Sequence, residues 1–157
     1  MSAPREKVTD QQVQEDLVRL DAYRSQLNAM VQQFQYLVNS RADHLRARET
    51  LEGLDRVKDD GELLIPVGGD AFLRGHPTPT APVLLGIGSG IVVEMERPKV
   101  SEILAQRLTK IDQAAQELEG QIRTLEERIQ HLSQRLDELG RSAEMGMGAA
   151  PDDVGRD

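Results

Sequence analysis

The 157-residue sequence contains no cysteine and no tryptophan, and aromatic residues make up only 3% of it. Without cysteine the chain has no disulfide framework, no thiolate nucleophile and no cysteine metal site. So few aromatic residues, within a hydrophobic fraction of 38%, are poor material for one globular core. We therefore expect the apolar residues to lie in lines along helices rather than in a compact core.

Positive charge and long apolar runs are also scarce. The chain has 19 Lys and Arg against 27 Asp and Glu, a net charge of -8, whereas binding to nucleic acid or to an anionic membrane needs a basic surface. Its apolar runs are far shorter than a membrane span, and the N-terminal sequence MSAPREKVTD lacks the pattern of a signal peptide. We predict a soluble, cytoplasmic protein that binds neither nucleic acid nor membrane.

Residues 9–57 have the periodicity of a coiled-coil helix. Thr9 and Gln12 fit a capping box, in which side chains satisfy early backbone N–H groups, so residues 1–8 are predicted to be a flexible N-terminus. The pattern drifts after Arg41 and Arg48, where a second, offset apolar line predicts either a stutter in the heptad pattern or a change of packing partner. The main line, at steps of three and four residues, comprises Val13, Leu17, Leu20, Arg24, Leu27, Val31, Phe34, Val38, Arg41 and Leu45, and the offset line comprises Leu37, His44, Leu51 and Leu54.

Residues 98–140 have a longer and stricter apolar ladder, which predicts a second coiled-coil helix. Pro98 suits the first helical turn, where a backbone N–H has no helical partner in any case. Gly120 falls outside the ladder and removes no core contact, and residues 141–157 lack periodicity and are predicted to be a disordered tail. The ladder consists of Leu104, Leu108, Ile111, Ala115, Leu118, Ile122, Leu125, Ile129, Leu132, Leu136 and Leu139.

The two predicted helices have similar lengths, about 73 and about 65 Å at about 1.5 Å per residue. The segment that connects them is long enough for the chain to turn back. The simplest way to cover both apolar lines is therefore an antiparallel coiled coil within one chain, which places both termini at one tip.

Residues 61–97 form a module of two predicted β-hairpins. Apolar residues flank Gly68-Gly69-Asp70 and Gly88-Ser89, which supply the positive φ angles of tight turns. With Gly88-Ser89 as a two-residue turn, Leu85 and Val92 lie on one face of the second hairpin. Both of its faces are apolar, and an isolated hairpin is marginally stable in water. We expect another subunit or the helix ends to cover this module, and we expect the module to mediate oligomerisation.

No catalytic or ligand-binding motif is evident in the chain. Residues Gly86 to Gly90 are rich in glycine, but neither a complete dinucleotide fingerprint nor the lysine of a P-loop follows them. His44, His76 and His131 lack the spacing of a metal site, and the many carboxylates alternate with arginines, as on solvated helix faces. We predict that the chain is not an enzyme and binds no metal or cofactor.

The free ends of the two helices are where apolar side chains should become accessible, because the ends of coiled coils fray. Methionine is flexible and polarizable, so it suits surfaces that accommodate varied partners. The tip is therefore predicted to bind other proteins. The candidate residues are Val8, Val13, Leu17, Leu132, Leu136, Leu139, Met145 and Met147.

The order of these segments resembles that of the alpha subunits of the prefoldin family. The resemblance spans residues 9–140 and depends on the hairpin sequences IPVGGDAFLRG and VLLGIGSGIVVE between two long heptad helices. Two hairpins point to the alpha class, because beta-class subunits have one. The resemblance implies an α+β fold, in which a long antiparallel two-helix coiled coil carries two central β-hairpins that assemble into an intersubunit β-barrel.

The resemblance also implies a function. Prefoldins are heterohexamers of two alpha and four beta subunits, whose coiled-coil tips hold non-native proteins without ATP and deliver them to a group II chaperonin. The tip residues named above would then contact these clients. The oligomerisation residues that the resemblance implies are Leu64, Ile65, Val67, Phe72, Leu84, Leu85, Ile87, Ile91, Val92 and Val93.

Two other classes of function are alternatives. A structural or adaptor coiled-coil protein explains the helices but leaves the hairpins with two apolar faces unexplained. An enzyme or a nucleotide-driven machine is disfavoured by the missing phosphate loop. Prevention of aggregation in the absence of ATP separates a chaperone from both alternatives.

Overall fold

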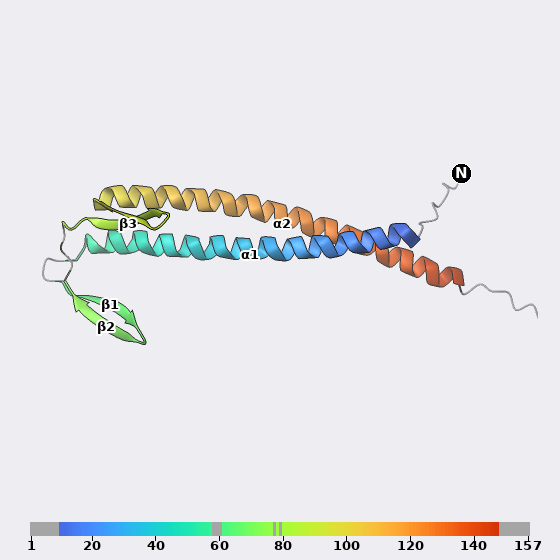
Figure 1. The fold of residues 1–157 in the computed structure, drawn as a ribbon, viewed down its shortest axis with the longest axis horizontal. Helices are drawn as coiled ribbons and strands as arrows, with labels where there is room; N and C mark the ends of the chain where they lie inside the picture. The colour runs from blue at the N-terminus through green and yellow to red at the C-terminus, as the bar shows by residue number, and fades with distance from the viewer. Residues whose placement is uncertain (1–9, 58–60, 77, 79, 148–157) are drawn as a thin grey trace, which may run out of the picture. The chain divides into compact units, whose positions relative to one another are not determined.

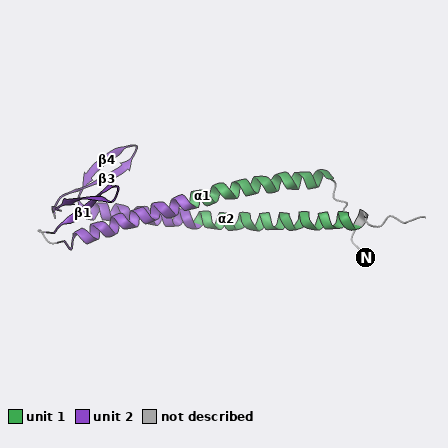
Figure 2. Ribbon diagram, turned by 90° about the horizontal axis from the view of Figure 1, so that it is seen from below, with its two compact units in different colours: residues 1–34, 117–157 green, residues 35–116 purple. Residues whose placement is uncertain are grey.

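The computed structural model describes residues 10–57, 61–76, 78 and 80–147. Two long helices flank two β-hairpins (Figure 1), which confirms the predicted α+β fold class. The chain divides into two compact units (Figure 2): Met1–Phe34 with Glu117–Asp157 form unit 1, and Gln35–Gln116 form unit 2. The elements are α1 (Asp10–Leu54), β1 (Leu63–Gly68), β2 (Ala71–Gly75), β3 (Val83–Gly88), β4 (Ile91–Met95) and α2 (Arg97–Met147).

The two helices run antiparallel, as predicted. In unit 2, Arg41 donates a hydrogen bond of 2.6 Å from Nε to Oδ1 of Asp112. In unit 1, Nε of Arg135 lies 3.6 Å from Oδ2 of Asp16. Contacts nearer the N-terminus of α1 thus involve residues nearer the C-terminus of α2, which is the order of an antiparallel pair.

The predicted ladder of α2 forms the buried face of that helix. Every residue of the ladder is buried or half-buried, because α1 and hairpin β3–β4 cover it in turn. Val100, which the sequence analysis missed, extends the ladder by one turn and is only 1% exposed. The fully buried ladder residues are Leu104, Leu108, Leu118, Leu125 and Leu132.

As far as Val38, the predicted line of α1 is correct at alternate positions and wrong at the positions between them. Beyond Val38, Arg41 is exposed and Leu45 is half-buried. Leu17, Val31 and Val38 are exposed, although the sequence analysis placed them in the core. The residues one position earlier, from Asp16 to Leu37, are covered in their place. The buried or half-buried residues of this part of α1 are Val13, Asp16, Leu20, Tyr23, Leu27, Met30, Phe34 and Leu37.

The error has a physical cause, which is that α1 has two adjacent apolar lines. Both lines contain Val13, Leu20, Leu27 and Phe34, so periodicity alone identifies these shared positions and cannot choose between the alternating neighbours. Packing against α2 makes that choice. Beyond Phe34, the residues of the predicted offset line are covered. Leu51 belongs to a cluster that includes Leu85 of β3, so the packing partners of α1 change there, which was one of the two expectations.

The ends of the helices differ from the predicted bounds. The first helix ends three residues earlier than predicted, at Leu54 rather than residue 57. Pro98 lies in the first turn of α2, as predicted, but α2 continues to Met147, so residues 141–147 are helical rather than part of a disordered tail. The rest of the predicted tail, residues 148–157, lies outside the described residues. Gly140 costs only about 1 kcal/mol in a helix interior, and Ser142 donates a hydrogen bond to the Glu138 carbonyl one turn earlier.

The two antiparallel hairpins are built alike. Each has a register shift just before its turn, and the glycine at that point has a positive φ, 99° at Gly68 and 113° at Gly88. The turn residues, Gly69-Asp70 and Ser89-Gly90, also have positive φ, as tight two-residue hairpin turns require. The predicted turn of the second hairpin was therefore one residue too early, because the bulge at Ile87 adds a residue to β3.

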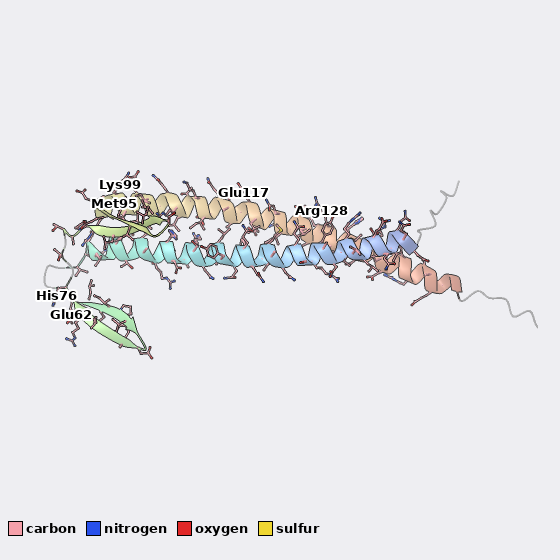
Figure 3. All side chains as sticks on the ribbon, viewed as in Figure 1. Glu62, His76, Met95, Lys99, Glu117 and Arg128 are labelled. Carbon is pink, nitrogen blue, oxygen red and sulfur yellow. The ribbon has the colours of Figure 1, made fainter. Side chains whose placement is uncertain are left out.

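This register changes which side chains of the second hairpin share a face. Leu85 pairs with Val93 and shares its face, whereas the prediction placed Leu85 on the same face as Val92, which pairs with Gly86. The face with Leu85 packs on the helices. The helix ends therefore cover one face of the second hairpin, which was one of the two expected ways to cover it. Met95, labelled in Figure 3, borders this contact. The core of unit 2 consists of Leu51, Leu85, Val100 and Leu104.

Candidate functional site

Two of the predicted tip residues are exposed. Leu17 of α1 and Met145 of α2 expose 52% and 78% of their surface. Leu132, by contrast, is only 7% exposed and belongs to the ladder, so it cannot contact a partner while the helices are paired. The other predicted residues are half-buried (Val13, Leu136 and Leu139), or lie outside the described residues (Val8 and the side chain of Met147).

Val18 is an exposed apolar residue that the sequence analysis missed. It exposes 67% of its surface, directly after Leu17. The residue lies on neither apolar line of α1, so a search for heptads passes over it. The available signal was the pair Leu17-Val18 itself, since two consecutive apolar residues on a two-stranded coiled coil cannot both point at the partner helix. We refer to Leu17, Val18 and Met145 as the terminal apolar residues.

A buried carboxylate interrupts the apolar seam beside these residues. Asp16 is 5% exposed and occupies a core position between Val13 and Leu20. Arg19 lies 3.8 Å from Oδ1 and Arg135 lies 3.6 Å from Oδ2, distances that allow attraction but are too long for hydrogen bonds. Oδ2 therefore has no hydrogen-bond partner. A buried polar atom in this state lowers the stability of the helix pair at this point.

Replacing Asp16 with Leu is expected to stabilise the helix pair by about 1–2 kcal/mol. The substitution removes a desolvated carboxylate and adds apolar contact in the seam. It leaves no buried charge behind, because Arg19 and Arg135 remain 57% and 48% exposed. The measurement is the urea midpoint of unfolding, followed by the helical circular dichroism signal.

The matched control for this substitution is Asp21→Leu, because Asp21 is an exposed aspartate on the same helix. It removes the same charge without filling the seam, so its midpoint should stay close to that of the unchanged chain. A lower midpoint for Asp16→Leu would mean that the ion pairs of Asp16 contribute more than its burial costs, which contradicts the prediction.

The second candidate surface lies on the hairpins. In β1–β2 Leu64 and Phe72 are exposed on one face, and Ile65 is exposed on the other. Apolar side chains exposed on both faces of a two-stranded sheet are unfavourable in water. The exposed apolar residues of both hairpins, which we call the hairpin surface, are Leu64, Ile65, Val67, Phe72, Leu73, Leu84, Ile87, Ile91 and Val92.

Two of the predicted oligomerisation residues face the chain's own helices instead. Leu85 is buried in the core of unit 2, and Val93 beside it is half-buried, so neither is free for a partner. Leu73 is exposed and was missing from the prediction. It lies opposite Ile65. The signal that could have found it was the consecutive apolar pair Phe72-Leu73, since neighbouring residues of a strand point to opposite faces.

The glycine-rich segment and the histidines have structural surroundings. The Gly86 carbonyl accepts a hydrogen bond of 2.8 Å from Arg107 of α2, which ties the hairpin to the helix. His44 and His76 each place Nδ1 within hydrogen-bond distance of a main-chain carbonyl, at 2.7 and 3.3 Å. Within the described ranges there is no group of three potential metal ligands. No helix among the described residues is long and apolar enough to cross a membrane.

Comparison with known proteins connects these features to a family. Residues 23–142 match the model of the prefoldin subunit family. A prefoldin subunit alpha from Methanocorpusculum labreanum is 29% identical over 136 residues, with 83% of this chain and 92% of that protein covered. Another, from Methanopyrus kandleri, is 35% identical over 118 residues, with 73% and 71% covered.

Two solved structures have a similar fold. A chain of filamentous PFD from Methanocaldococcus jannaschii superposes with a TM-score of 0.63 at 21% identity, covering 78% of this chain and 98% of that one. The prefoldin beta subunit from Thermococcus strain KS-1 gives 0.54 at 20% identity, covering 85% and 95%. The matched family model covers most of the helices and both hairpins, and the sequence relatives are alpha subunits. The chain therefore belongs to the prefoldin family, among its alpha subunits.

Proposed function

We propose that this chain is a subunit of an ATP-independent holdase, which binds non-native proteins at the ends of its coiled coil and delivers them to a group II chaperonin. It acts by binding and release, without catalysis. The observation that carries the proposal is the exposure of the terminal apolar residues, Leu17, Val18 and Met145, on a chain of the prefoldin family. We also propose that the protein is located in the cytoplasm.

Weak contacts support such a cycle. Three apolar side chains offer a small area, and burial contributes only about 25 cal/mol per Å², so one subunit holds a client loosely. Several subunits around one client raise the effective concentration of binding sites and hold it jointly. Because each contact is weak, a chaperonin that competes for the same apolar segments of the client can remove it without ATP hydrolysis by the holdase.

The hairpin surface is where we propose that subunits assemble. We propose a heterohexamer of two alpha and four beta subunits, in which hairpins of neighbouring subunits join into a β-barrel. The support is the row of exposed apolar residues in β1–β2 and on the outer face of β3–β4, together with the similarity to a prefoldin beta subunit. The similar archaeal chain comes from a filamentous PFD, so a filament is the other assembled form that a mass measurement must distinguish.

The test is suppression of aggregation in the absence of ATP. A chemically unfolded test protein is diluted into buffer with the full chain, alone and with a beta-class subunit, while light scattering reports aggregation and the mass in solution is recorded. Assembled protein should suppress aggregation, and Ser at Leu17, Val18 and Met145 should abolish most of the effect. These side chains are exposed, so the replacement should leave helix content unchanged.

The control replaces an equal number of exposed α1 residues, Val31, Tyr36 and Val38, with Ser. This variant should remain active, because those residues lie away from the helix end. If no assembled form suppresses aggregation, a structural or adaptor coiled-coil protein becomes the better description. If both variants lose activity equally, clients bind along the coiled coil rather than at its end.

A further inference from the structure

A groove along one side of the coiled coil in unit 1 is lined by arginines. Arg19 and Tyr23 of α1 contribute to it from one side, and Arg128 and Arg135 of α2 from the other. The buried Leu132 of α2 is also part of its lining. Arg128 is labelled on α2 in Figure 3. We call this feature the arginine groove.

The charge of the groove is opposite to that of the whole molecule. The chain has a net charge of -8, yet three arginines line this groove and Glu127 is the one acidic residue of its lining. Flanking positions of paired helices usually place opposite charges across from each other, which stabilises the pair. Arginines on both helices do not pair with each other, so each needs a carboxylate, either from within the helix pair or from outside it.

The groove already accommodates one carboxylate. Arg19 and Arg135 both approach Asp16, at 3.8 and 3.6 Å, and so share a single negative charge. In the described part of the chain, Arg128 has neither an ion pair nor a hydrogen bond. Its guanidinium retains all of its donors, and a guanidinium binds a carboxylate with two parallel hydrogen bonds.

Apolar surface lies next to these charges. Tyr23 is half-buried in the groove. A neighbouring hollow shares Thr124 and Arg128 with the groove and is lined by Met30. Gly120, also in that hollow, has no side chain, and a methyl group there would meet no atom within 4 Å. Glu117 and two glutamines also line the hollow. An extended chain thus finds cationic and apolar side chains next to each other, with one carboxylate in the hollow.

We propose that the arginine groove binds segments of non-native proteins in which Asp or Glu is flanked by apolar residues, with the carboxylate on Arg128 and the apolar neighbours toward Met30 and Tyr23. This assignment rests on the proposed holdase function and names part of its client class. Charge complementarity supports it: an acidic surface repels acidic segments elsewhere, and the groove offsets that repulsion locally.

The experiment measures peptide binding to the full chain, assembled with a beta-class subunit, by fluorescence anisotropy. Three unstructured peptides carry the same dye and the same Leu and Phe residues, with the intervening positions filled by Glu, by Gln or by Lys. The Glu peptide should bind more tightly than the Gln peptide, and 0.5 M NaCl should remove the difference. Arg128→Gln should weaken binding of the Glu peptide about three- to fivefold, and Arg128→Glu should weaken it further. Both variants should leave binding of the Gln peptide unchanged.

Arg123→Glu is the matched control, because Arg123 is an exposed arginine five residues away that pairs with Glu119 outside the groove. It changes the net charge equally and should not alter the preference for the Glu peptide. If the Glu and Gln peptides bind equally, or if Arg123→Glu has the same effect as Arg128→Glu, the proposed role of the arginine groove is overturned but the holdase proposal stays intact. Failure of all three peptides to bind overturns both. If the groove binds a folded acidic protein but does not bind the Glu peptide, its partner is a folded protein rather than a non-native client, which overturns the assignment.

Discussion

Replacing Leu104 with Ala is expected to lower the free energy of unfolding by about 2–5 kcal/mol. Leu104 is 4% exposed and belongs to the cluster in which α1, β3 and α2 meet, with Leu51, Leu85 and Val100. The three elements come from distant parts of the sequence, so no local rearrangement can fill the space that the side chain leaves. Urea unfolding followed by circular dichroism measures the change, at one fixed protein concentration because assembly adds to apparent stability.

The control for Leu104→Ala is Leu17→Ala. It makes the same chemical change on a side chain that is half exposed, so the expected loss is within about 0.5 kcal/mol. If Leu104→Ala costs no more than Leu17→Ala, the cluster does not hold hairpin β3–β4 on the helices. A second consequence can be checked in the same samples: hydrogen exchange in β3 and β4 should speed up in Leu104→Ala, because Leu85 loses a packing partner.

The ladder of α2 could be predicted residue by residue, and the line of α1 could not. From Leu118 to Leu136 each ladder residue of α2 has polar neighbours on both sides, so a single helical face satisfies the pattern. In α1 the pairs Asp16/Leu17 and Met30/Val31 compete for the same place in the seam. Hydrophobicity favours Leu17, whereas the structure buries Asp16 and pairs it with Arg135. That choice depends on a residue more than a hundred positions away.

The hairpins show a similar limit. Glycines and alternating apolar residues predicted both of them, but the bulge at Ile87 shifted the pairing by one residue, and a shift of one residue exchanges the faces of a strand. Leu85 consequently belongs to the chain's own core, while Val92 is exposed. The candidate site shares this limit at Leu17, because periodicity placed that residue in the seam, whereas the packing of α1 against α2 leaves it exposed.

Replacing Leu84 and Val92 with Asp is expected to prevent assembly of the proposed oligomer. Both side chains lie on the outer face of β3–β4 and expose 71% and 58% of their surface, so their replacement should leave helix content unchanged. Two charges inside an intersubunit contact would be desolvated without partners, which costs several kcal/mol. The measurement is mass by light scattering during size-exclusion chromatography, with and without a beta-class subunit; the expected result is a shift from the assembled mass to that of the single chain.

Asp at Val31 and Val38 of α1 provides the matched control for the loss of assembly. It adds the same two charges at exposed apolar residues that lie outside both hairpins, so the assembled mass should persist. If the hairpin variant assembles as well as the control, subunits do not join through the outer face of β3–β4, and the exposed residues of β1–β2 become the remaining part of the hairpin surface. The hairpin variant keeps its terminal apolar residues. If it loses assembly and also fails to suppress aggregation, holding a client requires several helix ends acting together. The weakness of each single contact predicts this result.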